Sequence, residues 1–145
     1  SFGLVQIKRF NKFSNIRVRN FNMHKKFFNS LKNFFITPKI NKNVKTNFLA
    51  YPIILKKNKY FKRKNLQIFL EKNNIQTRPI FSGNILRHPA FKKVISKRNK
   101  INAFKNSDYI MKNGILIGCH QGLSLKHMRY IHTKINEFLN KFIKL

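Results

Sequence analysis

The chain has 145 residues and a formal net charge of +29, from 32 lysines and arginines against three acidic residues. This length suffices for one domain with its own core and is short for two. The single cysteine, Cys119, excludes an internal disulfide and a cysteine-based zinc site, so its thiol is expected to be buried or incidental. No apolar run is long enough for a transmembrane helix and no secretory signal pattern is found, so we expect the reducing cytoplasm.

The basic residues do not gather in one part of the sequence. Residues 1–72 carry 18 of the 32, and residues 73–145 carry the other 14. A nucleic-acid footprint tends to cluster on one face or tail. The four residue types Lys, Asn, Ile and Phe also make up 78 of the 145 residues, and all four have codons rich in A and T. Genome composition alone can therefore produce this charge, and we do not expect nucleic-acid binding.

A long amphipathic helix is predicted from Phe2 to Leu31. Apolar residues recur there at steps of three and four, without a proline: Leu4, Ile7, Phe10, Phe13, Ile16, Phe21, Phe27 or Phe28, and Leu31. Thr37 and Pro38 are expected to end it, because proline disfavours a helical conformation in the preceding residue. The polar residues 39–47 predict a loop.

Two strands and a helix are predicted next. Residues 48–55 (FLAYPIIL) are typical of a mostly buried strand, in which Pro52 indicates an edge or a bulge because it cannot donate to the ladder. Residues 63–73 place Leu66, Phe69 and Leu70 on one helical face. Residues 77–81 predict a second strand, followed by a turn at Gly83 and Asn84.

Short elements are predicted after the turn. Residues 89–95 favour a short helix with Pro89 at its first position, and residues 96–105 favour an exposed loop. Ser107 is predicted to cap the start of another short helix, which Gly114 ends.

The chain is predicted to close with a strand and a helix. Residues 115–118 (ILIG) indicate a third strand, and Ser124 is the expected N-cap of the final helix. The apolar stripe of that helix comprises Met128, Ile131, Ile135, Phe138, Leu139 and Phe142. The order of elements predicts an α+β fold, a small sheet covered by helices with a long helix in front.

Several stretches in this order resemble one known family. They are FLAYPIIL (48–55), NNIQTRPIFSGNILRHPAF (73–91) and NSDYIMKNGILIGCHQGLS (106–124), each before or between helices, with SFGLVQIKRFNKFSNIRVRNFN (1–22) upstream. Together they resemble the C-terminal domain of the DegT-type sugar aminotransferases. The branch with CDP-4-dehydro-6-deoxyglucose 3-dehydratases and lipopolysaccharide biosynthesis proteins is the most similar, because a TR-hydrophobe-F-x-GN-x-x-x-x-P run is typical of it.

The resemblance implies the C-terminal small domain of a pyridoxal-phosphate (PLP) transferase of fold type I. Residues 1–36 would be the helix that links it to a PLP domain, and residues 37–145 would be the small domain itself. The resemblance further implies a nucleotide-sugar substrate, a homodimer, and PLP held by an N-terminal domain or a second chain. The dehydratase branch would add an iron–sulfur cluster, whose ligands this sequence lacks. A split gene, a decayed gene or a truncated gene prediction would account for the length.

Four residues are candidates for substrate binding. Arg78 carries a planar, permanently charged fork suited to phosphate or carboxylate, although a solvated or structural arginine fits equally. Asn84 is either a turn-former at positive φ or an amide that binds sugar hydroxyls. Arg87 and His88 could together meet the diphosphate of a nucleotide sugar. No catalytic residue is assigned.

The remaining titratable residues are given structural roles. Glu71 and Glu137 lie beside lysines on helices, and Asp108 favours the first turn of its helix. The histidines are scattered, so no metal site is predicted. His120 is expected to be structural, and three more histidines are expected on helix surfaces: His24, His127 and His132.

Three functions remain open at this stage. The first is the small domain of a nucleotide-sugar transaminase or 3-dehydratase, inactive by itself because the cofactor supplies the chemistry. The second is a small basic RNA-binding protein of the ribosomal type. The third is a gene fragment without function, whose apolar helix would lack its partner. The sequence does not distinguish amino transfer from dehydration, nor does it identify the nucleotide sugar.

Overall fold

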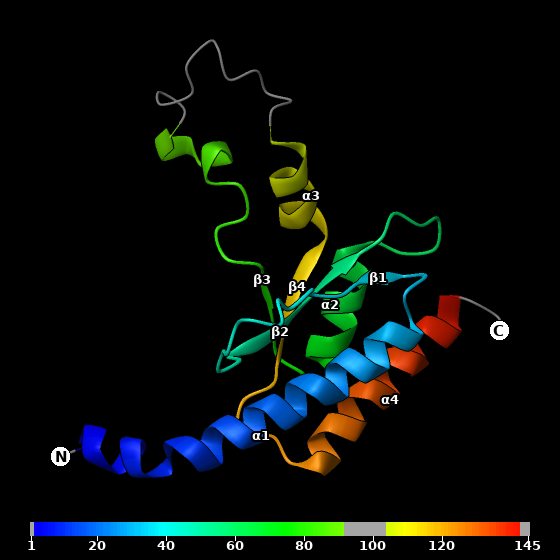
Figure 1. Ribbon diagram of the computed structural model, residues 1–145. Helices are drawn as coiled ribbons and strands as arrows, with labels where there is room; N and C mark the ends of the chain where they lie inside the picture. The colour runs from blue at the N-terminus through cyan, green and yellow to red at the C-terminus, as the bar shows by residue number, and fades with distance from the viewer. Residues whose placement is uncertain (1, 92–103, 143–145) are drawn as a thin grey trace.

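The computed structural model describes residues 2–91 and 104–142. The helices are α1 (Phe2–Ser30), α2 (Arg63–Lys72), α3 (Lys105–Asn113) and α4 (Leu125–Phe142), and the strands are β1 (Phe35–Ile36), β2 (Ala50–Leu55), β3 (Thr77–Pro79) and β4 (Gly114–Gly118). Two 3-10 turns, η1 (Ile85–Arg87) and η2 (Pro89–Phe91), follow β3. Figure 1 shows α1 and α4 side by side along one side of the sheet, with α3 and the turns extending from the other end. The α+β prediction is confirmed.

The four strands form one antiparallel sheet in the order β1-β2-β4-β3. Tyr51 of β2 lies opposite Ile117 of β4, and Thr77 of β3 lies opposite the same Ile117 on the other side. The strand β1 pairs with Ile54 and Leu55 only. At Pro52 the strand β2 therefore has β4 beside it and not β1, which accommodates a residue without an N–H.

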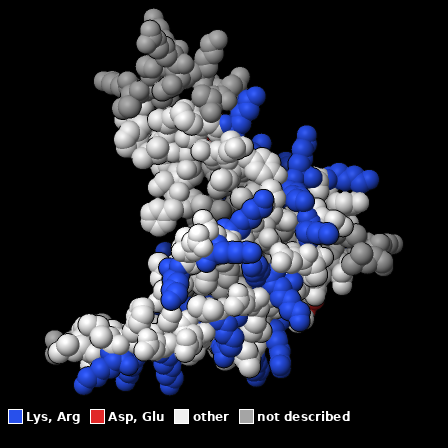
Figure 2. All heavy atoms as spheres, viewed as in Figure 1, with Lys and Arg blue, Asp and Glu red and all other residues white. Residues whose placement is uncertain are grey.

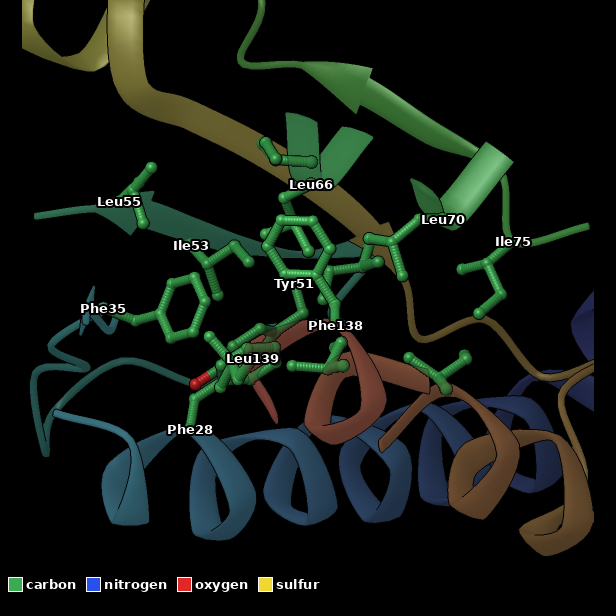
Figure 3. Close-up of a cluster of buried hydrophobic side chains, with 14 of the residues drawn as sticks. Phe28, Phe35, Tyr51, Ile53, Leu55, Leu66, Leu70, Ile75, Phe138 and Leu139 are labelled. Atoms are coloured by element: carbon green, nitrogen blue, oxygen red, sulfur yellow. The ribbon is translucent and has the colours of Figure 1, made fainter. Parts of the chain in front are cut away.

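Alternation along the strands directs one face of the sheet to the core. Tyr51, Ile53 and Leu55 are buried, whereas the residues between them are only half-buried. Figure 3 shows these side chains packed against residues from the helices. The cluster takes Phe21 and Phe28 from α1, Leu66 and Leu70 from α2, and Ile131, Ile135, Phe138 and Leu139 from α4. The second half of α1 thus shares one core with the sheet.

The first half of α1 carries apolar side chains that this core does not cover. Leu4 and Ile7 are 66% and 71% exposed, and Phe10 is also exposed. In Figure 1 this half of the helix extends beyond the sheet and α4. Lysine and arginine side chains lie along α1 and over the body of the molecule in the view of Figure 2, without forming one patch.

The sequence did not predict β1. The helix α1 ends at Ser30, whose Oγ donates to the Phe27 carbonyl, and not at Thr37. A turn follows, and Phe35 then enters the core as part of β1. This two-residue strand exists only through its pairing with β2, almost 20 residues further along the chain. Local periodicity cannot predict such a pairing.

The boundaries of two further elements differ from prediction. Strand β3 ends at Pro79, and Phe81 is 88% exposed in the following turn. Helix α3 begins at Lys105 with Phe104 at the N-cap, so Ser107 lies inside the helix and does not cap it. Its predicted end at Gly114 is confirmed. The helix predicted over 89–95 begins as η2, and its remainder, with most of the predicted loop 96–105, lies outside the described residues.

The final helix agrees with its prediction. The Ser124 Oγ accepts a hydrogen bond from the His127 backbone N–H at 3.3 Å, which is the geometry of an N-cap. Five residues of the predicted stripe, from Met128 to Leu139, are buried, whereas Phe142 is 40% exposed. The helix packs against both α1 and α2.

Candidate functional site

A cavity of about 560 Å³ lies between the sheet and the start of α4. Its walls come from the start of β2 and the residue before it, from β3 and the loop that leads into it, from the second half of β4, and from the first half of α4 with the loop before it. Arg78 is the one predicted site residue in these walls. Its side chain is exposed, and it projects from β3 at the position opposite Leu116 of β4.

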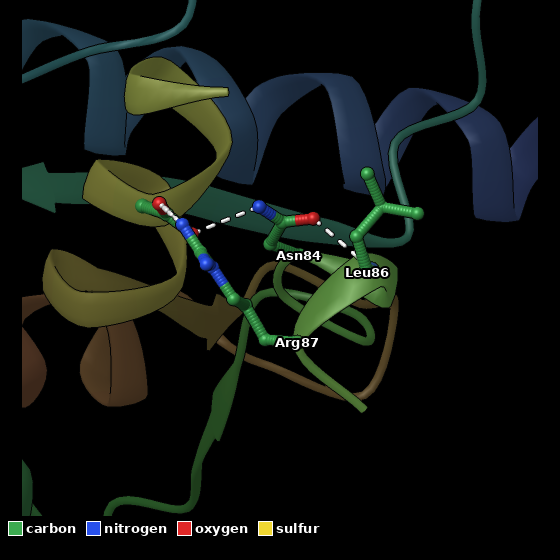
Figure 4. A network of polar contacts seen from close by, with 4 residues as sticks. Asn84, Leu86 and Arg87 are labelled. Carbon is green, nitrogen blue, oxygen red and sulfur yellow. Dashed lines mark hydrogen bonds and ion pairs between the residues drawn. The ribbon is translucent and has the colours of Figure 1, made fainter. Parts of the chain in front are cut away.

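The other three predicted residues lie in the segment after β3. Asn84 is buried, and its amide nitrogen donates to Asp108 Oδ1 at 2.8 Å while its amide oxygen accepts from the Leu86 N–H at 3.1 Å. Figure 4 shows these contacts with Arg87 beside them. The φ angle of Asn84 is −97°, so the expected positive φ is wrong at this position. In this turn, the positive φ values fall on Ser82 (54°) and Gly83 (56°) instead.

Arg87 is tied to the same carboxylate as Asn84. Its Nε donates to Asp108 Oδ1 at 2.9 Å, and a terminal guanidinium nitrogen contacts Asp108 Oδ2. The Arg87 guanidinium, followed by the Asn84 amide, lowers the pKa of Asp108 to about 2, and the same contact raises the pKa of Arg87. These bonds join the loop after β3 to α3.

His88 has a local contact. One of its ring nitrogens, Nε2, lies 2.9 Å from the Ser82 carbonyl oxygen, which can only accept, so Nε2 donates. The bond closes the turn that contains Gly83. The structure thus brings Asn84, Arg87 and His88 together in one loop, and it places Arg78 separately in the wall of the cavity.

Sequence reasoning missed the part that Asp108 plays. Asp108 does lie in the first turn of α3, as expected, but its carboxylate is taken up by the loop after β3. The two partners are 24 and 21 residues away, so spacing along the chain gives no signal for them. The other two acidic side chains also have partners. Glu71 accepts hydrogen bonds from the Thr77 N–H and hydroxyl, both at 2.7 Å, and Glu137 forms an ion pair with Lys134.

Two histidines expected on helix surfaces are packed inside. His24 is fully buried and His132 is half-buried, and His24 Nδ1 lies 3.1 Å from His132 Nε2. His24 Nε2 lies 2.9 Å from the Gly118 carbonyl oxygen. Burial lowers the pKa of each ring to about 4. A signal was present, since His24 falls on the same helical face as Phe21 and Phe28.

Cys119 is buried, as expected, with its Sγ 3.8 Å from the Phe48 carbonyl oxygen. Burial raises the pKa of the thiol to about 11. Within residues 2–91 and 104–142, no three His, Cys, Asp or Glu side chains gather as metal ligands. No helix in those two ranges combines the length and apolar composition needed to span a membrane.

The sequence and the fold were compared with known proteins. The model of the DegT/DnrJ/EryC1/StrS aminotransferase family matches residues 1–136. The lipopolysaccharide biosynthesis protein RfbH of Salmonella typhimurium is 32% identical over 136 residues, which are 94% of this chain and 31% of RfbH. The dTDP-4-dehydro-2,6-dideoxy-D-glucose 3-dehydratase of Saccharopolyspora spinosa is 30% identical over 142 residues, which are 97% of this chain and 30% of that enzyme.

A solved structure has the same fold. The E. coli GDP-4-keto-6-deoxy-D-mannose-3-dehydratase with bound hydrated PLP has a TM-score of 0.72 and 25% identity, over 91% of this chain and 33% of that one. The chain thus spans about a third of the length of these relatives. The family match covers both the long helix and the sheet that follows it, and the chain therefore belongs to the DegT/DnrJ/EryC1/StrS aminotransferase family.

Proposed function

We propose that this chain is the C-terminal portion of a PLP-dependent enzyme that acts on a nucleotide-linked keto sugar in the biosynthesis of lipopolysaccharide sugars. The family match over residues 1–136 is the observation that carries the proposal. Two relatives that support it are named as 3-dehydratases of nucleotide-linked deoxy sugars, and a third as a lipopolysaccharide biosynthesis protein. The reaction is amino transfer or 3-dehydration.

The cavity beside β4 does not fit a complete PLP site. The walls of the cavity contain neither a lysine nor a carboxylate, so they offer no amine for a Schiff base and no acid for the pyridine nitrogen. Asp108 is already bound by Arg87 and Asn84. PLP would be held by another part of the enzyme, and so would an iron–sulfur cluster of the dehydratase type, because the one cysteine here is buried. This chain by itself is then inactive.

In this proposal, residues 1–36 link the small domain, residues 37–145, to the part that holds PLP. The exposed apolar residues on the first half of α1, Leu4, Ile7 and Phe10, support a covered position for that half. The partner is an N-terminal domain or a second chain, and the assembled enzyme is a homodimer. The cytoplasm is the proposed compartment.

The loop after β3 is proposed to face the nucleotide sugar. Asn84 and Arg87 hold the loop against α3 through Asp108, and His88 closes its turn, so their contacts fix the position of the loop before any ligand arrives. Arg78, on the neighbouring strand, presents a guanidinium suited to phosphate. Substrate binding by these four residues would orient the sugar and leave the proton transfers to the part that holds PLP.

The coding sequence tests the proposal. The DNA immediately upstream of the codon for Ser1 is sequenced and translated in all frames, and the rest of the genome is searched in the same way. A segment of the family type with a PLP-anchoring lysine indicates a transaminase, and one with histidine at that position indicates a dehydratase. If the genome encodes neither, the proposed function is wrong for this chain.

A further inference from the structure

The cavity beside β4 combines apolar walls with hydrogen-bond donors and no acid. Leu116, Leu123 and Ile131 supply apolar surface, and Arg78 supplies a guanidinium. Two histidines, His120 and His127, also lie in the walls, as do the amide side chains of Asn74 and Gln76. The identity of the donor atoms on these two rings follows from their backbone contacts.

His120 has its proton on Nε2. The Gly122 backbone N–H donates to His120 Nδ1 at 3.1 Å, so Nδ1 is an acceptor and the neutral ring carries its hydrogen on Nε2. The Nε2 edge faces Gly118, since a Cβ built on Gly118 would lie 3.8 Å from Nε2. Gly118 is itself part of the cavity wall. The Cδ2–Nε2 edge of the His120 ring therefore lies beside that part of the wall.

His127 has the same tautomer for the same reason. The Ser124 backbone N–H donates to His127 Nδ1 at 3.2 Å, which leaves the hydrogen on Nε2. Tyr130 adds no free donor, because its hydroxyl donates to the Asn73 carbonyl oxygen at 3.1 Å. The ring in the loop before α4 and the ring in its first turn thus both carry their hydrogen on Nε2.

Within residues 2–91 and 104–142, no acidic side chain pairs with the guanidinium of Arg78. Each of the three acids is bound elsewhere: Glu71 to Thr77, Asp108 to Arg87 and Asn84, and Glu137 to Lys134. The cavity consequently has a positive charge, two N–H donors of fixed tautomer and an apolar surface. A carboxylate or phosphate group would match the positive charge and the N–H donors, and a compact apolar body would match the apolar surface.

We propose that this cavity binds a small organic oxyanion, a carboxylate or phosphate ester carried on an apolar body, with Arg78 contacting the charged group. The His120 and His127 rings donate to the same group. The apolar body lies against Leu116, Leu123 and Ile131. The site shares Arg78 with the proposed substrate-binding residues, and it is otherwise separate from the loop of Asn84, Arg87 and His88, none of which lies in its walls.

The test is an NMR titration of the 145-residue chain at neutral pH, with four probes. Benzoate and phenyl phosphate carry both the anion and the apolar body, benzamide is the neutral match of benzoate, and inorganic phosphate lacks the apolar body. Resonances of the methyl groups of Leu116, Leu123 and Ile131 and of the histidine ring nitrogens report binding. The ring-nitrogen spectrum of the free protein also reports the two tautomers.

Benzoate or phenyl phosphate is expected to bind with shifts confined to the cavity, and to bind at least roughly tenfold more tightly than benzamide or inorganic phosphate. Arg78→Gln should remove that preference. Arg9→Gln is the matched control, because it removes the same charge from an exposed position on the first half of α1. It should leave the affinity for both anions unchanged.

Four results would overturn the inference: no saturable binding of either aromatic anion, equal binding of benzamide, an equal loss in both variants, or an Nδ1–H tautomer of His120 or His127. The last is measured on the unmodified chain, so it decides the matter even if Arg78→Gln does not fold. The titration needs neither PLP nor a nucleotide sugar. Its failure would also remove the support for Arg78 as a phosphate contact, but it would leave the proposed reaction untouched, because the family match carries that reaction. A failure of the proposed reaction would leave this site standing.

Discussion

The Gly118 carbonyl sets the positions of the hydrogens on buried His24 and half-buried His132. A carbonyl oxygen only accepts, so His24 Nε2 donates to it and His24 Nδ1 must accept. The donor to His24 Nδ1 is then His132 Nε2. Both rings are neutral in this arrangement, and a proton added to His24 Nδ1 would face the N–H of His132. The chain of hydrogen bonds from β4 through α1 to α4 therefore requires neutral rings.

This pair predicts a loss of stability in mild acid. The pKa of each ring is lowered in the folded state from its ordinary 6.5 to about 4. The unfolded chain therefore binds more protons between these values, and stability falls as the pH drops from 6.5 to 4. For His24 alone, the free energy of unfolding should fall by about 2 kcal/mol between pH 7 and pH 5. Urea unfolding at both pH values measures it.

His24→Leu supplies the check on that assignment. It should lower stability at pH 7, because the Gly118 carbonyl loses its donor, yet it should roughly halve the dependence on pH between 7 and 5, because the burial of His132 remains. His88→Gln, in an exposed loop, should keep the dependence of the original chain. An unchanged pH dependence in His24→Leu would contradict the role given to the pair.

The turn after β3 depends on glycine at position 83. Its φ is +56°, and a Cβ there would lie 2.3 Å from Met111 Cγ on α3. Gly83→Ala should therefore destabilise the fold by about 1–2 kcal/mol from backbone strain, with a further cost from the clash. Gly3→Ala is the control, because nothing lies within 4 Å and helix α1 favours alanine. Thermal unfolding of both variants measures the difference, and equal midpoints would contradict the close approach of the turn to α3.

At the scale of elements, α1 has two halves with different surroundings. Phe28, in the second half, is fully buried and stacks on Tyr51 with ring centroids 5.5 Å apart. Leu4, in the first half, is mostly exposed. One helix is thus anchored in the core at its end and lies outside it at its beginning.

The two halves of α1 should respond differently to truncation of an apolar side chain. Phe28→Ala should cost about 3–5 kcal/mol, because it leaves a cavity in the core. Leu4→Ala, the matched control, should change stability by no more than about 0.5 kcal/mol. Denaturant midpoints of the two variants provide the measurement. A large loss of stability from Leu4→Ala would mean that other residues of this chain already cover the first half of α1, and would contradict its exposed position.

The elements differ in how far local sequence determines them. The helices α1, α2 and α4 have strong periodicity, and Ser124 caps α4 as predicted, so they could be placed from sequence. The strand β1 could not, because its two residues depend on β2. The predicted start of α3 was wrong, because serine is a common N-cap residue but Ser107 lies inside the helix. The loop after β3 was identified as the polar site, but its anchor, Asp108, comes from a distant helix.

At the scale of the whole molecule, the charge is the dominant physical feature. A net charge of +29 is distributed over the surface, and two ion pairs join the described residues. Mutual repulsion of like charges disfavours the compact state, and salt screens it over about 10 Å at 0.1 M. The even spread of basic residues along the sequence disfavours a clustered nucleic-acid footprint, whereas the domain-level placement came from the resemblance alone.

The charge predicts a stability that rises with ionic strength. The melting temperature should increase as sodium chloride is raised from about 0.02 M to about 0.5 M, because screening weakens the repulsion in the folded state. Sucrose at matched osmolality controls for general solute effects. If the melting temperature does not change with salt, repulsion does not limit the stability of this fold.

The central claim is that the chain supplies the small domain of a PLP-dependent nucleotide-sugar enzyme. The most direct measurement is the turnover of a nucleotide-linked 4-keto-6-deoxyhexose by the family-type PLP-binding polypeptide of the same genome, with and without the 145-residue chain. We predict no turnover by either polypeptide alone and turnover when the two are joined or expressed together. Turnover by the PLP-binding polypeptide that does not depend on this chain would contradict the account.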